Sequence, residues 1–267
     1  MKRKVLIFYI LTIICLLSSC GNHKLDKELA QIDSLADVDL DAAKTIYDSI
    51  ADYIEDDTKS NRMYYKLLRI KIADKSYEEI TSDKEIKLIT SYFEREKNTY
   101  RLAESYFYAG RIYNKLSNQL LSAKFFNKAL KIDSINTKPE LLSRCCLNLS
   151  NIYGRQFKLN LALQYARKAL EYARKTDDKT LLAYSLIEVS KVSEDDDEIE
   201  SLIAEAKDIV KGSNNKDLYN EAINCLIINS IDNEDYYKAL AYCDSIDTSA
   251  LKYDGLDAHR YILGAIY

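Results

Sequence analysis

The sequence of 267 residues has few of the residues that interrupt helices and few of those that most often carry acid–base chemistry. It contains one Pro, six Gly, no Trp and two His. A β-sandwich or an α/β enzyme of this length needs more Gly and Pro for its turns, so the composition favours long helices joined by short polar connections. Histidine is the commonest general base. Because His23 lies beside the amino-terminal leader, only His259 remains in the body. We therefore expect a helical protein that is not an enzyme and holds no cofactor.

The amino-terminal segment has the features of a secretory leader. Residues 1–4 carry three basic side chains, and residues 5–17 form an apolar run interrupted by Thr12. Such a run is too short for a bilayer core, which needs roughly 20 residues, and suits the apolar part of a signal peptide. Residues 17–20, Leu-Ser-Ser-Cys, resemble the bacterial lipobox. That resemblance implies a lipoprotein signal peptide at 1–19 and lipid attachment at Cys20; an ordinary signal peptide with a chance Cys and an uncleaved anchor are the alternatives.

The charge and the cysteines restrict the partners further. The formal net charge is −4, and loss of the basic leader would make it more negative. No basic tract follows Cys20, so neither nucleic acid nor an anionic lipid surface is favoured. The four body cysteines lack a C-x-x-C pair, so no metal site is expected, and the adjacent Cys145 and Cys146 make a poor disulfide. We expect all four to be small buried residues, with a bridge between Cys225 and Cys243 as the open alternative.

A period of forty residues organises the middle of the chain. The segments 106–113, 146–153 and 186–193 begin with Tyr, Cys and Leu, and each has an apolar residue three later and then a small one: Gly110, Ser150 and Ser190. The downstream halves keep the same interval, and both halves space their apolar residues by three and four. This spacing predicts two amphipathic helices in each repeat, with small residues where the helices approach closely.

These repeats resemble the tetratricopeptide repeat (TPR), a helix–turn–helix unit of about 34 residues that stacks into a superhelix. The residues that carry the resemblance are 109–113, Phe126, Ala129, Leu130, Ala162, Tyr165, Ala169 and Leu170. The resemblance implies an all-α fold, a right-handed α-solenoid of TPR-like helical hairpins. The expected repeats lie at about 103–136, 143–176, 183–212 and 220–247, with an incomplete one at 257–267.

The ends of this array are less regular. Residues 20–100 are expected to form an amino-terminal helical cap with degenerate repeats, and their helices are predicted at 25–35, 40–50, 62–75 and 82–97. The fifth repeat lacks its second helix, and a bare solenoid end would leave an apolar face in water. We therefore expect the natural chain to continue past Tyr267.

In TPR proteins the first helix of each repeat faces a concave groove that binds peptides. Carried onto this sequence, that role falls to Glu104, Phe107, Arg111 and Lys115, and then to Arg144, Asn148, Asn151 and Arg155. Arg matches carboxylates and Asn pairs with peptide backbone, so the resemblance implies an acidic or carboxyl-terminal peptide as ligand. The alternative is that these side chains only keep the surface solvated.

The acidic run at 194–198 invites comparison with a calcium loop. It lacks the alternating ligands and the central Gly of an EF-hand. Acidic residues also cap helix starts and interact favourably with the helix dipole. We therefore predict that this run begins the second helix of the third repeat and holds no metal.

The chain as a whole resembles TPR lipoproteins of Gram-negative bacteria. That resemblance implies a non-catalytic scaffold for a protein or peptide, anchored by lipid in the cell envelope, at the periplasmic face of the outer membrane. Two alternatives stay open. The chain could be the exported sensory region of a longer transmembrane signalling or transcription-regulatory protein. It could instead be a glycan-binding lipoprotein, which the absence of Trp disfavours.

Overall fold

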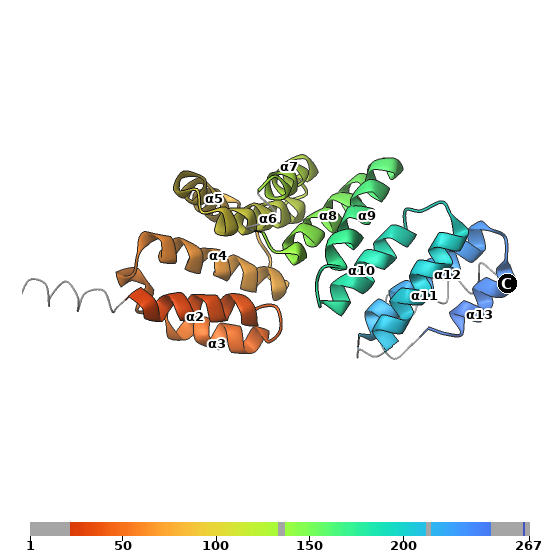
Figure 1. Cartoon of the computed structure of the whole chain (residues 1–267), viewed down its shortest axis with the longest axis horizontal. Helices are drawn as coiled ribbons and strands as arrows, with labels where there is room; N and C mark the ends of the chain where they lie inside the picture. The colour runs from red at the N-terminus through yellow and green to blue at the C-terminus, as the bar shows by residue number, and fades with distance from the viewer. Residues whose placement is uncertain (1–21, 133–136, 212–214, 247–263, 265–267) are drawn as a thin grey trace, which may run out of the picture. The chain divides into compact units, whose positions relative to one another are not determined.

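The computed structural model describes residues 22–132, 137–211, 215–246 and Gly264. Within these ranges the chain forms helices and no strand (Figure 1). The chain divides into two compact units, unit 1 (Met1–Phe125) and unit 2 (Phe126–Tyr267), which are described separately. The predicted signal peptide, the Cys20 attachment site and, apart from Gly264, the incomplete repeat at 257–267 lie outside the described residues.

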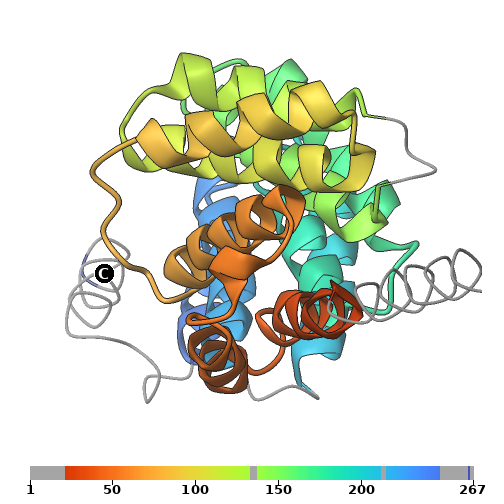
Figure 2. The same ribbon diagram turned by 90° about the vertical axis from the view of Figure 1, so that its left-hand side faces the viewer.

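Unit 1 contains three successive first helices with their partners. Its elements are α2 (Asn22–Leu35), α3 (Leu40–Ser49), the 3-10 helix η2 (Ile54–Asp56), α4 (Lys59–Lys75), α5 (Lys84–Glu96), α6 (Thr99–Lys115) and the first part of α7 (Gln119–Leu130). Helix α4 packs against α2 and α3 on one side and against α5 and α6 on the other (Figure 2). The helices predicted at 25–35, 40–50, 62–75 and 82–97 are confirmed to within a few residues at each end.

The described residues of unit 2 form three complete helical hairpins. They are α8 (Pro139–Gly154) with α9 (Leu159–Ala173), α10 (Lys179–Ser190) with α11 (Asp196–Lys211), and α12 (Lys216–Asp232) with α13 (Tyr236–Cys243). Helix α10 also packs against α8, α9 and α12, so each hairpin covers its neighbour. The all-α solenoid that the TPR resemblance implies is confirmed.

Small residues sit where the helices meet, as the spacing predicts. The hydroxyl of Ser122 on α7 donates to the carbonyl of Gly110 on α6 at 2.8 Å. In unit 2 the buried hydroxyl of Ser143 on α8 donates to the carbonyl of Ala169 on α9 at 2.9 Å. A side chain can reach the neighbouring backbone in this way only when the two helices lie close together.

Side chains cap the starts of α10, α11 and α12 in unit 2. Asp178 and Asn215 accept hydrogen bonds from backbone N–H groups at the starts of α10 and α12. Asp195 accepts from the N–H of Glu198 at 3.0 Å, and the first turn of α11 is acidic. The prediction that residues 194–198 begin a helix is therefore confirmed.

The four body cysteines are buried and carry free thiols, as expected. The alternative disulfide between Cys225 and Cys243 is not formed. Burial raises the pKa of Cys146 to about 12, and burial likewise raises the pKa of Cys145 well above its usual range. These thiols thus pack as small apolar side chains and stay protonated near neutral pH.

The forty-residue period also appears in the backbone of the turns. Tyr77, Ser117 and Phe157 lie forty residues apart, and each has a left-handed φ of 56–58°. Each follows the end of a first helix, and the next residue donates back to a carbonyl of that helix, as Lys158 does to Tyr153 at 3.0 Å. This is a Schellman-type helix end, which usually has Gly at the left-handed position. The same turn geometry therefore recurs in unit 1 and unit 2 without glycine.

Candidate binding surfaces

The residues expected to line a groove lie on α6, in unit 1, and on α8 and its carboxyl-terminal cap, in unit 2. Both are first helices of hairpins. We call the first helices α2, α4 and α6 the first-helix row of unit 1, and α8, α10 and α12 the first-helix row of unit 2. The two rows differ in how far their polar side chains are already paired.

In unit 1 the expected groove cations bind an acidic residue of the preceding first helix. The Arg111 Nε donates to Oδ2 of Asp74 at 3.0 Å, and the Lys115 Nζ lies 3.0 Å from Oδ1 of the same residue. The Asp74 carboxylate is buried, so it depends on these cations for charge compensation. Phe107 is only 7% exposed and packs edge-on against Tyr108. These residues tie α6 to α4.

A second ionic cluster lies deeper in the first-helix row of unit 1. The Lys71 Nζ on α4 lies 2.7 Å from Oδ1 of Asp33 and 2.7 Å from Oδ2 of Asp37, both carboxylates of the α2 end. Glu104 on α6 places its Oε1 3.9 Å from the same ammonium. The hydroxyl of Tyr100 donates to Oδ2 of Asp33 at 3.0 Å. Lys71, Asp33 and Glu104 are all buried, so this cluster joins three first helices inside unit 1.

The surroundings of Glu104 and Asp37 shift their pKa values in opposite directions. Burial raises the pKa of Glu104 to about 8, the neighbouring Asp33 charge adds to the rise, and Lys71 opposes it. The Oε2 atom of Glu104 is buried without a hydrogen-bond partner. For Asp37, burial favours the neutral acid, but Lys71 and Lys75 outweigh it and lower the pKa to about 2. Burial and the Asp33 charge therefore favour the protonated form of Glu104 beside Lys71 and its carboxylates.

In unit 2 some of the expected groove residues form contacts with neighbouring residues, and others are exposed. The Arg144 guanidinium lies 3.2 Å from Oδ2 of Asp178, the residue that caps α10. The Asn148 amide donates to the carbonyl of Arg144 at 2.7 Å. Asn151 and Arg155, one and two turns further along, are exposed. The exposed residues of the expected groove thus lie at the carboxyl-terminal end of α8.

The first-helix row of unit 2 continues with apolar side chains in water. On α10, Tyr184 is 42% exposed, and on α12 Ile228 is 57% exposed. Between them Lys191 of α10 and Glu221 of α12 form an ion pair. Tyr184 and Lys191 are seven residues apart, as are Glu221 and Ile228, so each pair shares one face of its helix. The row therefore offers hydrogen-bonding groups on α8 and apolar anchors on α10 and α12.

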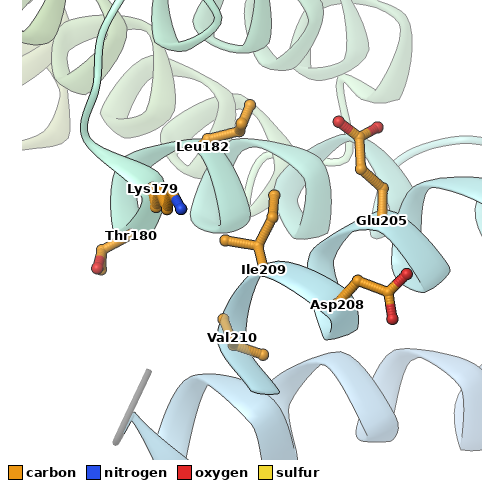
Figure 3. A pocket seen from close by; sticks show the side chains of 7 residues that line it. All are labelled: Lys179, Thr180, Leu182, Glu205, Asp208, Ile209 and Val210. Carbon is orange, nitrogen blue, oxygen red and sulfur yellow. The ribbon is translucent and has the colours of Figure 1, made fainter. Parts of the chain in front are cut away.

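Unit 2 also has a pocket of about 570 Å³ between the start of α10 and the end of α11, which we call the α10–α11 pocket (Figure 3). Leu182, Ile209 and Val210 supply its apolar lining. Its polar lining residues are Lys179, Thr180, Glu205 and Asp208. The two carboxylates come from α11, whereas the Lys and Thr come from the first turn of α10. No sequence signal pointed to this pocket.

Two further features of the described ranges bear on function. Within them, no three His, Cys, Asp or Glu residues are grouped closely enough to hold a metal ion. A search of the same residues finds no helix with both the length and the apolar character needed to cross a membrane.

Comparison with known proteins identifies a fold but no sequence relative. No protein-family model matches the chain, and no curated protein sequence matches it. Among solved structures, the apo form of RapI is similar, with a TM-score of 0.68 and 15% sequence identity. The similarity covers 91% of this chain and 81% of RapI. At this identity the likeness concerns architecture alone, and it shows that the chain has an all-α, TPR-like helical-repeat fold.

Proposed function

We propose that the chain is a non-catalytic scaffold that binds a peptide segment of a partner protein along the first-helix row of unit 2. The observation that carries this proposal is the row's combination of exposed Asn151 and Arg155 with exposed Tyr184 and Ile228. An amide and a guanidinium match peptide backbone and carboxylate groups, and the apolar side chains supply the anchors that peptide grooves use.

The contrast with unit 1 restricts where a peptide would bind. There Arg111, Lys115 and Lys71 are occupied by carboxylates of neighbouring helices. A ligand carboxylate would have to displace Asp74 or Asp33, and each displacement would leave a buried charge without its partner. The predicted groove residues Phe107, Arg111 and Lys115 are therefore weaker candidates than Asn151 and Arg155, although they remain part of the proposed surface.

The test is capture by photocrosslinking from the chain's native membranes. We would place a photoreactive residue at Asn151 and compare the native chain with Arg155→Glu and with Tyr184→Ser. Both substitutions should reduce recovery of the same crosslinked partner. Arg167→Glu is the matched control, because Arg167 is an exposed cation on the second helix α9. If Arg155→Glu captures as much partner as the native chain does, the first-helix row of unit 2 is not the binding surface.

We further propose that Cys20 is acylated and holds the chain at the periplasmic face of the outer membrane. The basic leader, its apolar run and the Leu-Ser-Ser-Cys tetrad support this proposal. Mass spectrometry should find a mature chain that begins at a lipid-modified Cys20, and Cys20→Ala should move the chain to the soluble fraction. Sucrose-gradient separation of the membranes tests the membrane, and protease treatment of intact cells tests the leaflet.

The two alternatives have their own tests. The genomic sequence downstream of Tyr267 decides the sensory alternative: an apolar run of about 20 residues followed by a kinase or DNA-binding domain would support it. An early stop codon would exclude it. For glycan binding, a panel of oligosaccharides should leave the melting temperature unchanged if the scaffold proposal is correct.

A further inference from the structure

The turn between α8 and α9 carries an aromatic side chain that does not serve the fold of its own unit. Phe157 has a left-handed φ of 57° and is 89% exposed. Gly or Asn would form this turn without the steric conflict of a bulky side chain. Here a strained backbone position presents an apolar ring to water, which is unfavourable on both counts. The same left-handed turn recurs at Tyr77 and Ser117, so it is the exposed ring, and not the turn, that points to a contact with another molecule.

The surroundings of Phe157 are basic. Arg155 and Lys158 are exposed on either side of it, and Leu159 is 45% exposed. No acidic residue occurs between Glu140 and Glu171 in the sequence. We call residues 155–159 the Phe157 tip. It presents an aromatic ring between two cations, followed by an aliphatic side chain.

The α10–α11 pocket has the complementary character. Leu182 and Ile209 supply half-buried apolar surface, and Glu205 and Asp208 are exposed carboxylates beside them (Figure 3). Lys179 also lines the pocket, so its side chains carry two negative charges and one positive charge. Glu205 lies 3.1 Å from Arg174, but both side chains are about half exposed, so this pair is weak and can rearrange. Its volume of about 570 Å³ is ample for one aromatic side chain.

We propose that the Phe157 tip of one copy binds in the α10–α11 pocket of a second copy. The ring of Phe157 would lie on Leu182 and Ile209, while Arg155 and Lys158 face the two carboxylates. Opposite charges around an apolar centre fix both the partner and its orientation. This proposal goes beyond peptide binding by the first-helix row. The two proposals share Arg155, so Phe157 and Lys158, which lie beyond the end of α8, distinguish them.

The two surfaces cannot meet within one copy. The tip follows the end of α8, whereas the pocket lies at the start of α10, after α9 has carried the chain back by about 22 Å. A contact between two different surfaces of identical chains is heterologous, so it forms rings or open chains rather than an isolated twofold dimer. A single tip buries far less than the roughly 1,000 Å² of a stable interface, so the association should be transient and concentration-dependent.

The test is photocrosslinking between isotopically distinct copies of the full chain in detergent. Phe157→benzoylphenylalanine keeps an aromatic ring at the tip, and equal amounts of ¹⁴N- and ¹⁵N-labelled chain are mixed before irradiation. We expect mixed-isotope crosslinks from position 157 to peptides that contain residues 179–182 or 205–210. Tyr77→benzoylphenylalanine is the matched control, because Tyr77 is also left-handed and 91% exposed, but Glu78 and Glu79 follow it. A benzoylphenylalanine at position 77 should not label the α10–α11 pocket.

Charge reversal supplies the second measurement. Glu205→Lys with Asp208→Lys should lower the crosslink yield about tenfold, because cations would then face cations. A tip copy with Arg155→Glu and Lys158→Glu should restore the yield with that pocket variant. Unchanged melting curves establish that each variant is folded. Crosslinks from position 157 only to other sites, to detergent or lipid, or to another protein would overturn the proposal, as would an absence of mixed-isotope products or a yield insensitive to charge reversal.

Discussion

Replacing Glu104 by Gln should change how the stability of unit 1 depends on pH. The folded pKa of Glu104, about 8, lies above its ordinary value of 4.5. The folded chain therefore binds more protons than the unfolded chain between these values, so the free energy of unfolding falls as pH rises through this window. A Gln side chain at this position cannot titrate, and its amide can donate a hydrogen bond much as the protonated acid does. The variant should thus lose this pH dependence.

The size of the effect follows from the shift. At 1.36 kcal/mol per pKa unit, a rise from 4.5 to about 8 corresponds to at most about 5 kcal/mol of stability lost between pH 5 and 9. Relaxation around the carboxylate and proton sharing with Asp33 reduce this figure. Glu104→Gln should therefore be close to the native chain in stability at pH 5 and clearly more stable at pH 9. Asp37, whose pKa is lowered to about 2, acts with the opposite sign and contributes stability that is lost only as pH falls below about 4.

The assay must report on unit 1 alone, because the chain has two units and no Trp. Hydrogen exchange measured by mass spectrometry at several pH values, corrected for the intrinsic rate, gives opening free energies for peptides from α2, α4 and α6. Glu205→Gln is the control, because Glu205 is an exposed carboxyl group in unit 2. The reasoning fails if the native chain and Glu104→Gln show parallel pH dependences in those three helices.

Three further substitutions test the interactions that hold the repeats. Lys71→Met leaves the buried Asp33 carboxylate without its cation and should destabilise unit 1 by about 3–5 kcal/mol, measured by the same hydrogen exchange in α2, α4 and α6; an effect under about 1 kcal/mol would mean that the cluster is solvated. Phe157→Gly relieves the left-handed strain and should stabilise unit 2 by about 1 kcal/mol, seen as a higher melting temperature, whereas a decrease would show that the ring packs on its own unit. Asp178→Ala removes the α10 cap and the partner of Arg144, and should cost about 1 kcal/mol, whereas the neighbouring Asp177→Ala should cost little.

The repeat architecture could be predicted because it depends on the spacing of residues that are close together in the sequence. Apolar residues three and four apart, with small residues at Gly110 and Ser150 recurring every forty positions, determine both the helices and their close packing. The helix at Asp196 could be predicted for the same reason, since capping involves residues only three apart in the chain. Each of these features depends on near neighbours, which the sequence shows directly.

The state of the expected groove could not be predicted in the same way. Arg111 has the right type and the right helix face for a ligand cation, yet its partner Asp74 lies 37 residues earlier. Phe107 shares a helix face with Arg111 but is buried. Whether such a side chain is free depends on what the neighbouring repeat places opposite it. That information appears only when the hairpins are stacked.

The scarcity of glycine predicted the helices, but it also meant that the left-handed turns could not be predicted. Few Gly residues correctly indicated long helices, but they also removed the usual marker of a Schellman helix end. The turns at Tyr77, Ser117 and Phe157 form nonetheless, with non-glycine residues in a strained conformation. A period of forty was the one available signal, since it places these three residues in equivalent positions.

The two first-helix rows differ in whether their polar side chains are paired within the unit or exposed. In unit 1 successive first helices carry opposite charges that pair with one another. Lys71 of α4 pairs with a carboxylate of α2, and Asp74 of α4 pairs with a cation of α6. In unit 2 the end of α8 exposes Asn151 and Arg155, and α10 and α12 expose apolar side chains. A peptide would meet the exposed Asn151 and Arg155 without breaking a buried ion pair. A ligand for this chain should therefore be sought on unit 2, while the charges of unit 1 hold its helices together.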